Sequence, residues 1–302
     1  MRSAPLTKIN HAFQISSKVP EITLIFWIAK LLTTAMGEAT SDYLVSHFNP
    51  YVAVCLGAVF FLAAFALQLA VRRYIAWVYW LMVAMVSVFG TMMADVVHIV
   101  LGVPYVLSTL FFAMALAFIF IAWWLLEKTI SIHSIRTRRR ELFYWAAVIA
   151  AFALGTAAGD MTASTFRLGY SGSSILFTVL FALPIIAGTR LGLNEILTFW
   201  FAYVMTRPMG ASWADWFDKP LSMGGLGYGD GSISLVLTTL IVAVVAYLTI
   251  RGRGAKAGFV ARRHGVSGTG PTQGDPASHR VDPHHLMGAM QRPAPTEQAT
   301  ES

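Results

Sequence analysis

Charged residues and cysteine are both scarce in this sequence. Asp, Glu, Lys and Arg together make up 12% of the 302 residues, whereas they make up about 25% of an average soluble domain. This shortage excludes an ordinary soluble enzyme and a disordered regulator, because both depend on a charged, solvated surface. The single cysteine, Cys55, excludes an internal disulfide and with it a secreted disulfide scaffold.

The motifs of the common enzyme classes are also missing. The sequence has no His-rich di-metal box, no nucleophile elbow, no glycine-rich phosphate loop after a strand and no C-x-x-C-H haem site. The glycines between Met223 and Gly229 are typical of a turn. We therefore expect neither an enzyme nor a resident cofactor.

Hydrophobic residues are abundant instead, at 56% of the chain, with a mean hydropathy of +0.62. A membrane-crossing helix needs about 20 mostly apolar residues. Segments that reach or approach this length predict an all-α, polytopic membrane helix bundle with eight transmembrane helices, for which the lipid bilayer is the first partner. These segments are 22–44, 50–71, 76–98, 104–126, 143–162, 173–190, 195–217 and 232–250.

The predicted spans divide the chain into three parts. Residues 1–17 form a cytoplasmic N-terminal segment, and residues 18–250 form the transmembrane domain. Residues 251–302 are rich in Gly, Pro, Ser, Thr and charge, which predicts a disordered cytoplasmic tail. The tail histidines could weakly hold a metal, although a solvated tail without ligand geometry is the favoured interpretation. They are His264, His279, His284 and His285.

The basic residues between the spans lie mainly on one side. Arg72 and Arg73 follow the second span, a cluster from Lys128 to Arg140 follows the fourth, and Arg190 follows the sixth. The positive-inside rule then places both termini in the cytoplasm, as an even number of spans also requires. We expect a multi-pass protein of the bacterial inner membrane. The net charge of +7 is explained by this topology, so we expect no nucleic-acid partner.

One pattern, W-x9-G-x4-D, recurs four times without a gap. It divides the transmembrane domain into repeats of about 18–71, 72–137, 138–190 and 191–250, each a two-helix hairpin. All four hairpins share one orientation, so an axis along the membrane normal would relate them. The repeated residues are Trp27, Trp80, Trp145 and Trp200; Gly37, Gly90, Gly155 and Gly210; and Asp42, Asp95, Asp160 and Asp215.

The repeat resembles a known family of bacterial membrane-anchored proteins. That family is built from four tandem two-helix transmembrane repeats of unknown function, each with a characteristic Trp. The resemblance rests on the opening residues 18–21 (KVPE) with Phe26-Trp27, and on residues 205–212 (MTRPMGAS) in the last repeat. It implies the architecture and no particular activity.

The repeated Trp and Gly have structural interpretations. The Trp is expected to anchor each hairpin at the cytoplasmic membrane interface, with packing against a neighbouring repeat as the alternative. The Gly begins a small-xxx-small stripe, which predicts close approach of the first helices of the repeats near the centre. A pseudo-fourfold ring and two packed pairs of hairpins are equally compatible with this stripe.

The repeated Asp carries the functional hypothesis. A carboxylate at membrane depth, at the C-terminal end of a helix, is disfavoured unless a proton, a cation or a basic side chain compensates it. We therefore expect a cation or proton pathway. Its candidate residues are Glu38, Asp42, Asp95, His98, Asp160 and Asp215. The alternative is that the Asp residues bind loop backbone or pair with Arg167 and Lys219.

Two further buried basic residues need partners, Lys30 in the first repeat and Arg207 in the fourth. Glu38 is expected to form an ion pair with one of them. Pro208 is expected to kink the seventh span. The predicted function is transport of a cation, specifically efflux of a divalent metal such as manganese with proton exchange. The alternatives are a carrier for a small organic solute, which would use Lys30 or Arg207, and a non-transporting structural or partner-binding subunit.

Overall fold

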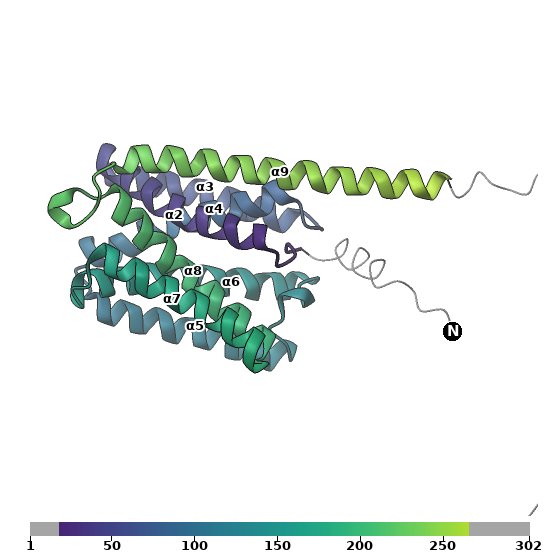
Figure 1. Cartoon of the computed structure of the whole chain (residues 1–302), viewed down its shortest axis with the longest axis horizontal. Coiled ribbons are helices and arrows are strands. Elements are labelled where there is room, and N and C mark those ends of the chain that lie inside the picture. Colours follow the sequence, from purple (N-terminus) through teal and green to yellow (C-terminus); the bar gives the residue numbers. More distant parts are fainter. Residues whose placement is uncertain (1–17, 266–302) are drawn as a thin grey trace, which may run out of the picture. The chain divides into compact units, whose positions relative to one another are not determined.

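The computed structural model describes residues 18–265, and within that range every regular element is a helix (Figure 1). The eight long helices of this range coincide closely with the predicted segments. They are α2 (Leu24–His47), α3 (Pro50–Ala70), α4 (Ala76–Asp95), α5 (Tyr105–Glu127), α6 (Arg138–Asp160), α7 (Gly169–Leu191), α8 (Glu195–Asp218) and α9 (Asp230–Gly265). Five-residue π-helical turns extend α4 as η1 (Val96–Val100) and α6 as η3 (Met161–Thr165).

Local sequence explains where several helices begin and end. Asn49 accepts a hydrogen bond from the backbone N–H of Tyr51 at 3.0 Å, and Pro50 occupies the first turn of α3. Asn194 caps α8 in the same way, through the N–H of Ile196 at 2.9 Å. Both are preferred N-cap residues, because a short side-chain oxygen satisfies a free helix N–H. Gly192 ends α7 in the left-handed conformation, at φ 64°, which a glycine adopts without steric cost.

Six of the helices are long and apolar enough to cross a membrane, which indicates a multi-pass membrane protein. These candidate spans are Pro50–Ala70, Ala76–Val100, Tyr105–Glu127, Arg138–Thr165, Gly169–Gly188 and Asp230–Gly252. The other two long helices, α2 and α8, contain the charged residues Lys30, Glu38 and Arg207, all of which are buried. Their polarity therefore belongs to the interior of the bundle and not to its surface.

The first helices of the repeats contact one another in a closed order, α2 with α4, α4 with α6, α6 with α8, and α8 with α2. Each of α3, α5 and α7 packs against the first helix of the following repeat (Figure 1). Within an apolar stretch of 18 residues, 61% is buried in the helix Arg138–Thr165, but only 11% is buried in the helix Asp230–Gly252. The first helices therefore form an inner ring, and the second helices turn large apolar side chains outward.

Aromatic contacts close this inner ring at one end. The aromatic residue before each Trp contacts the Trp of the next repeat, and the fourth contacts the first. The centroid distances are 5.8 Å for Phe26–Trp80, 5.6 Å for Tyr79–Trp145, 6.1 Å for Tyr144–Trp200 and 5.8 Å for Phe199–Trp27. We call this end of the bundle the tryptophan end.

This arrangement corrects the expectation that the Trp residues are interfacial anchors. Trp80, Trp145 and Trp200 are at most 4% exposed, and Trp27 is partly buried. The indole N–H of Trp200 donates to the backbone carbonyl of Ile130 at 2.9 Å. The rings face neighbouring repeats and not a wet interface, so their role is the alternative one of packing.

The repeated Gly marks the close approach of each first helix to the next. A Cβ on Gly37, Gly155 or Gly210 would overlap Ser87, Arg207 or Thr34 respectively, each on the following first helix. At Gly90 the nearest atom, Cβ of Phe152, would lie at 3.7 Å. Close packing of small residues is thereby confirmed, and the contacts follow a ring and not two separate pairs.

Helix α9 corrects the predicted boundary at residue 250. It continues to Gly265, so residues 251–265 are helical and not part of a disordered tail. Arg and Ala supply seven of these fifteen residues, and both favour helix. The rest of the tail, including His279, His284 and His285, lies outside the described residues, as does the segment 1–17.

Candidate functional site

A row of inward positions, spaced four residues apart, runs along each first helix. We call it the inner row; it starts at the aromatic residue before the Trp and ends at the repeated Asp. From the tryptophan end its levels are Phe26, Tyr79, Tyr144 and Phe199; Lys30, Val83, Val148 and Tyr203; Thr34, Ser87, Phe152 and Arg207; Glu38, Thr91, Thr156 and Ala211; and Asp42, Asp95, Asp160 and Asp215. All residues of the four levels between the tryptophan end and the Asp level are buried. We call the opposite end the aspartate end.

The middle of the inner row holds a buried ion pair. Nη2 of Arg207 lies 2.5 Å from Oε2 of Glu38, and both side chains are at most 6% exposed. The same Nη2 donates to Thr91, whose hydroxyl also lies 3.2 Å from Oε2 of Glu38. Arg207 further donates through Nη1 to the carbonyl of Thr34 at 3.3 Å. The predicted ion pair of Glu38 is therefore confirmed, and of its two candidate partners the structure selects Arg207.

Lys30 does not take part in this pair. Its Nζ lies 3.7 Å from the ring centroid of Phe152 and 4.2 Å from that of Tyr203. No hydrogen-bond partner for this Nζ occurs among the described residues, although the side chain is 1% exposed. The ammonium is therefore enclosed by aromatic faces, which attract a cation electrostatically.

The aspartate end brings acidic residues from two first helices together. Oxygen atoms of Glu38, Asp42 and Asp215 lie within 4.8 Å of one another, close enough to share one metal ion. Lys219, which follows α8, forms an ion pair with Asp42 and lies 3.7 Å from Asp215 and 3.8 Å from Asp218. We call Asp42, Asp215, Asp218 and Lys219 the outer charge cluster.

The charge of Lys219 is favoured by this cluster. Burial alone would lower the pKa of Lys219, but Asp42, Asp215 and Asp218 outweigh burial and raise this pKa above its ordinary value. Lys219 therefore stays protonated at neutral pH. The predicted alternative, in which the repeated Asp pairs with a basic side chain, is confirmed for Asp42 and Asp215 through Lys219. Arg167 is exposed, and the structure gives it no ion pair with a described residue.

The other two repeated Asp residues do not join the close group of carboxylates. Asp95 and Asp160 occupy the equivalent level of the inner row and are partly buried. Neither makes a hydrogen bond or ion pair through its carboxylate with a residue in the range 18–265. They lie at the aspartate end without contributing to the group formed by Glu38, Asp42 and Asp215.

His98 is a further candidate that the structure does not bring to the close group formed by Glu38, Asp42 and Asp215. Its Nδ1 lies 3.0 Å from the carbonyl of Val103, and its Nε2 lies 3.3 Å from the hydroxyl of Ser108. Both contacts are within its own hairpin. His98 lies in the π-helical turn η1, which rotates it away from the face that α-helical spacing from Asp95 predicts.

Two residues of the site are missing from the sequence-based candidates, Thr91 and Asp218. Thr91 occupies the position of Glu38 in the second repeat, so comparison of the repeats level by level would have identified it. Asp218 lies beside Lys219 and outside the repeated pattern. Its burial depends on the folding of the loop after α8, for which the sequence offers no signal.

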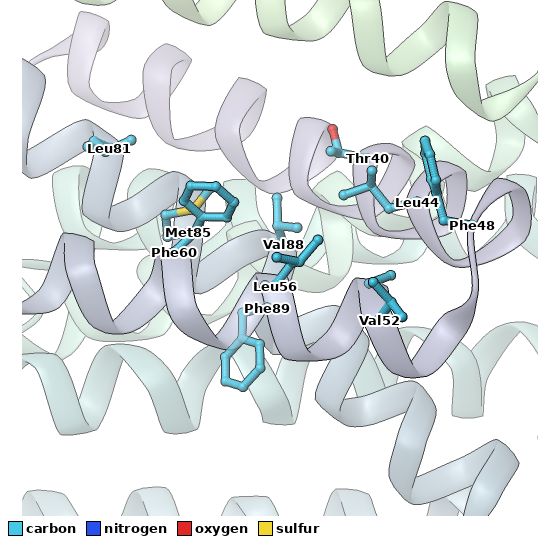
Figure 2. Close-up of a pocket in the computed structure, with 12 residues that line it drawn as sticks. Thr40, Leu44, Phe48, Val52, Leu56, Phe60, Leu81, Met85, Val88 and Phe89 are labelled. Atoms are coloured by element: carbon cyan, nitrogen blue, oxygen red, sulfur yellow. The ribbon is translucent and has the colours of Figure 1, made fainter.

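Apolar grooves on the outside of the bundle do not suit a polar ligand. One groove of about 470 Å³ lies between α2, α3 and α4, and Thr40 supplies the one hydroxyl among its apolar lining (Figure 2). A second, of about 590 Å³, lies between α2, α8 and α9 and is lined by residues such as Leu31, Trp213 and Val236. The polar chemistry is thus in the inner row and the outer charge cluster.

Comparison with known families agrees with the repeated architecture. Matches to one family, described as Repeat of Unknown Function (DUF347), cover residues 25–74, 78–129, 143–192 and 198–253 in tandem. Each match begins within the first six residues of one inner-ring helix and covers one hairpin. No curated protein and no solved structure matches the chain. The four matches cover most of the chain, which therefore belongs to the Repeat of Unknown Function family (DUF347).

Proposed function

We propose that this protein is a transporter of the bacterial inner membrane with eight spans, in which α2 and α8 cross the membrane inside the bundle. The four hairpins are related by a pseudo-fourfold axis along the membrane normal. The cyclic aromatic and glycine contacts between successive repeats support this arrangement. Basic residues at the tryptophan end, such as Arg72, Arg139 and Arg140, support a cytoplasmic position for that end and for both termini.

The transported species in this proposal is a cation. The observation that carries it is the convergence of carboxylate oxygens from Glu38, Asp42 and Asp215 within 4.8 Å inside a membrane bundle. Carboxylate oxygens suit hard or borderline ions such as Mg²⁺, Mn²⁺ and Ca²⁺. We take Mn²⁺ as the specific candidate and efflux as the direction, with protons moving inward through the same carboxylates as the driving force.

The route follows the inner row. A cation that reaches Glu38 from the tryptophan end has to pass the aromatic level and Lys30, and then compete with Arg207 for the carboxylate. Beyond Glu38 it meets Asp42 and Asp215, which pair with Lys219. Transport therefore requires rearrangement of these ion pairs, which have to exchange protein cations for the transported one.

Flux of Mn²⁺ in proteoliposomes tests the proposal. Asp42→Asn and Glu38→Gln remove one charge each with little change in shape, and each is expected to lower the initial flux at least about tenfold, because a buried cation loses a charged ligand. Glu195→Gln, on an exposed residue at the tryptophan end, is the matched control. Normal flux in both site variants would overturn the proposal. Loss of folding without selective loss of flux would favour the structural-subunit alternative.

A carrier for a small organic anion is the second candidate. It is favoured by two unsatisfied buried donors, Nζ of Lys30 and Nε of Arg207, neither of which has a hydrogen-bond partner among the described residues. A carboxylate-bearing solute could bind both. Exchange of labelled organic anions by the wild type, abolished by Lys30→Met and insensitive to Mn²⁺, would establish this function in place of cation transport.

A further inference from the structure

The loop after α8 holds Lys219 in a defined position. The N–H of Lys219 donates to the carbonyl of Asp215 at 3.0 Å, and its carbonyl accepts from the N–H of Gly227 at 2.8 Å. Three more backbone bonds join the loop to α8, from Leu226 to Trp216 at 2.7 Å, from Tyr228 to Phe217 at 3.1 Å and from Gly229 to Asp218 at 3.1 Å. The backbone of Lys219 is thereby held at the aspartate end by a hydrogen-bonded loop.

Asp218 is the least satisfied member of the outer charge cluster. Its side chain is fully buried, at 0% exposure, and neither carboxylate oxygen has a hydrogen-bond partner in the described part of the chain. Lys219 lies 3.8 Å away, which is too far for a hydrogen bond. Burial of a carboxylate without hydrogen bonds is costly unless a cation compensates it. The cluster therefore holds a buried carboxylate that Lys219 does not satisfy by a hydrogen bond.

The balance of charge in the outer charge cluster also favours a bound cation. Three carboxylates, Asp42, Asp215 and Asp218, surround one ammonium, and of these only Asp42 is close enough to it for a hydrogen bond. An ammonium has three donors but a single positive charge, so its charge compensates only one of the three carboxylates. A divalent cation takes six or more oxygen ligands and carries twice the charge. It would compensate this cluster better than the ammonium of Lys219 can.

We propose that Lys219 is a tethered ammonium that occupies a divalent-cation site formed by Glu38, Asp42 and Asp215, with the carboxylate of Asp218 beside Lys219, and that the cation binds there by displacing the ammonium. This inference rests on the proposed transport of a cation and assigns its outer binding site and the group that closes it. Displacement is a change of ion pairs alone, in which no covalent bond forms or breaks. Lys219 then sets the affinity of the site and closes it whenever no cation is bound.

Binding of Mn²⁺ to the purified full chain in detergent tests the displacement. Lys219→Met keeps the length of the side chain and removes its charge, so Mn²⁺ is expected to bind at least about tenfold more tightly than to the wild type. Lys219→Arg keeps the charge and should retain the wild-type affinity. The double variant Asp215→Asn with Lys219→Met should lose most of the gain, because Asp215 is one of the three grouped carboxylates. Equal affinities of the wild type and Lys219→Met would overturn the inference.

A measurement on the wild type covers the case in which Lys219→Met does not fold. An amine-acylating reagent should modify Lys219 slowly, because the ammonium is paired and partly buried. Added Mn²⁺ should accelerate this modification at least about threefold by releasing the ammonium, while modification of Lys128, at the tryptophan end, stays constant. Mn²⁺-independent or slowed modification of Lys219 would contradict displacement.

The two proposals fail in different ways. Mn²⁺ flux could depend on Glu38 and Asp42 while Lys219→Met leaves Mn²⁺ affinity unchanged and Mn²⁺ leaves the acylation of Lys219 unchanged. In that case the transport proposal survives and the tethered ammonium is rejected. If Lys219 is displaced by Mn²⁺ but liposomes show no flux, the outer site binds a cation without transporting it.

Discussion

Arg207 of α8 donates from Nη2 to Oε2 of Glu38 of α2 at 2.5 Å, and this pair joins the first and last repeats inside the bundle. Removal of one partner leaves the other charge buried and uncompensated. Arg207→Met or Glu38→Met alone should therefore lower the free energy of unfolding by about 3–5 kcal/mol. The double variant should be markedly more stable than either single variant, because no unpaired charge remains. Unfolding in a denaturing detergent, followed by circular dichroism, measures all three.

The double variant also separates stability from function. It should fold and yet transport no Mn²⁺, because Glu38 is one of the proposed ligands. Additive losses of stability in the double variant would show that Arg207 and Glu38 do not depend on each other. Recovery of flux along with recovery of stability would show that Glu38 acts in packing alone.

The sequence predicted this pair because a charge buried in a membrane needs a partner, but it did not distinguish Arg207 from Lys30. The structure supplies the reason. Lys30 and Glu38 are eight residues apart on one helix, about 12 Å along its axis, whereas Arg207 lies on the neighbouring helix one level of the inner row away. Helix order around the ring decides the partner, and order is not encoded in a single repeat.

The hairpins, the repeat and the close approach at the glycines were all predictable, because hydrophobic length and spacing determine them locally. The positions of Trp80 and His98 were not. Whether an aromatic ring at a helix end faces lipid headgroups or a neighbouring helix depends on how the repeats assemble. The direction of His98 depends on the π-helical turn after Asp95, which the spacing of the residues does not reveal.

The glycines of the inner ring should differ in their tolerance of a methyl group. Gly210→Ala would place a Cβ against the side chain of Thr34 and the backbone of Ala35, so we expect a loss of about 1–3 kcal/mol of stability. Gly90→Ala has ordinary van der Waals space and gains helix propensity, so we expect no loss. The same unfolding measurement compares them. Equal losses at both positions would mean that the helices do not approach one another as the structure shows.

The aromatic contacts at the tryptophan end should be a main source of stability. Trp145 is 1% exposed and contacts Tyr79 of the preceding repeat, whereas Trp124 is 55% exposed. We expect Trp145→Ala to cost about 3–5 kcal/mol, as large-to-small core substitutions do, and Trp124→Ala to cost less than about 1 kcal/mol. Thermal unfolding in detergent measures both. A larger loss at Trp124 would restore the interpretation of tryptophan as a membrane anchor.

Lys30 offers the opposite case, a buried charge whose removal should not destabilise the fold. Its ammonium has aromatic faces on two sides but no hydrogen-bond acceptor among the described residues. The cation–π contacts contribute on the order of 1–2 kcal/mol, whereas a buried ammonium without hydrogen bonds costs several kcal/mol. Lys30→Met, which keeps the shape of the side chain, should therefore unfold at the same temperature as the wild type or higher. Lys128→Met, at an exposed residue of the tryptophan end, serves as control. A clear decrease in the unfolding temperature of Lys30→Met alone would mean that water or a bound anion satisfies the ammonium, which would strengthen the case for an anion carrier.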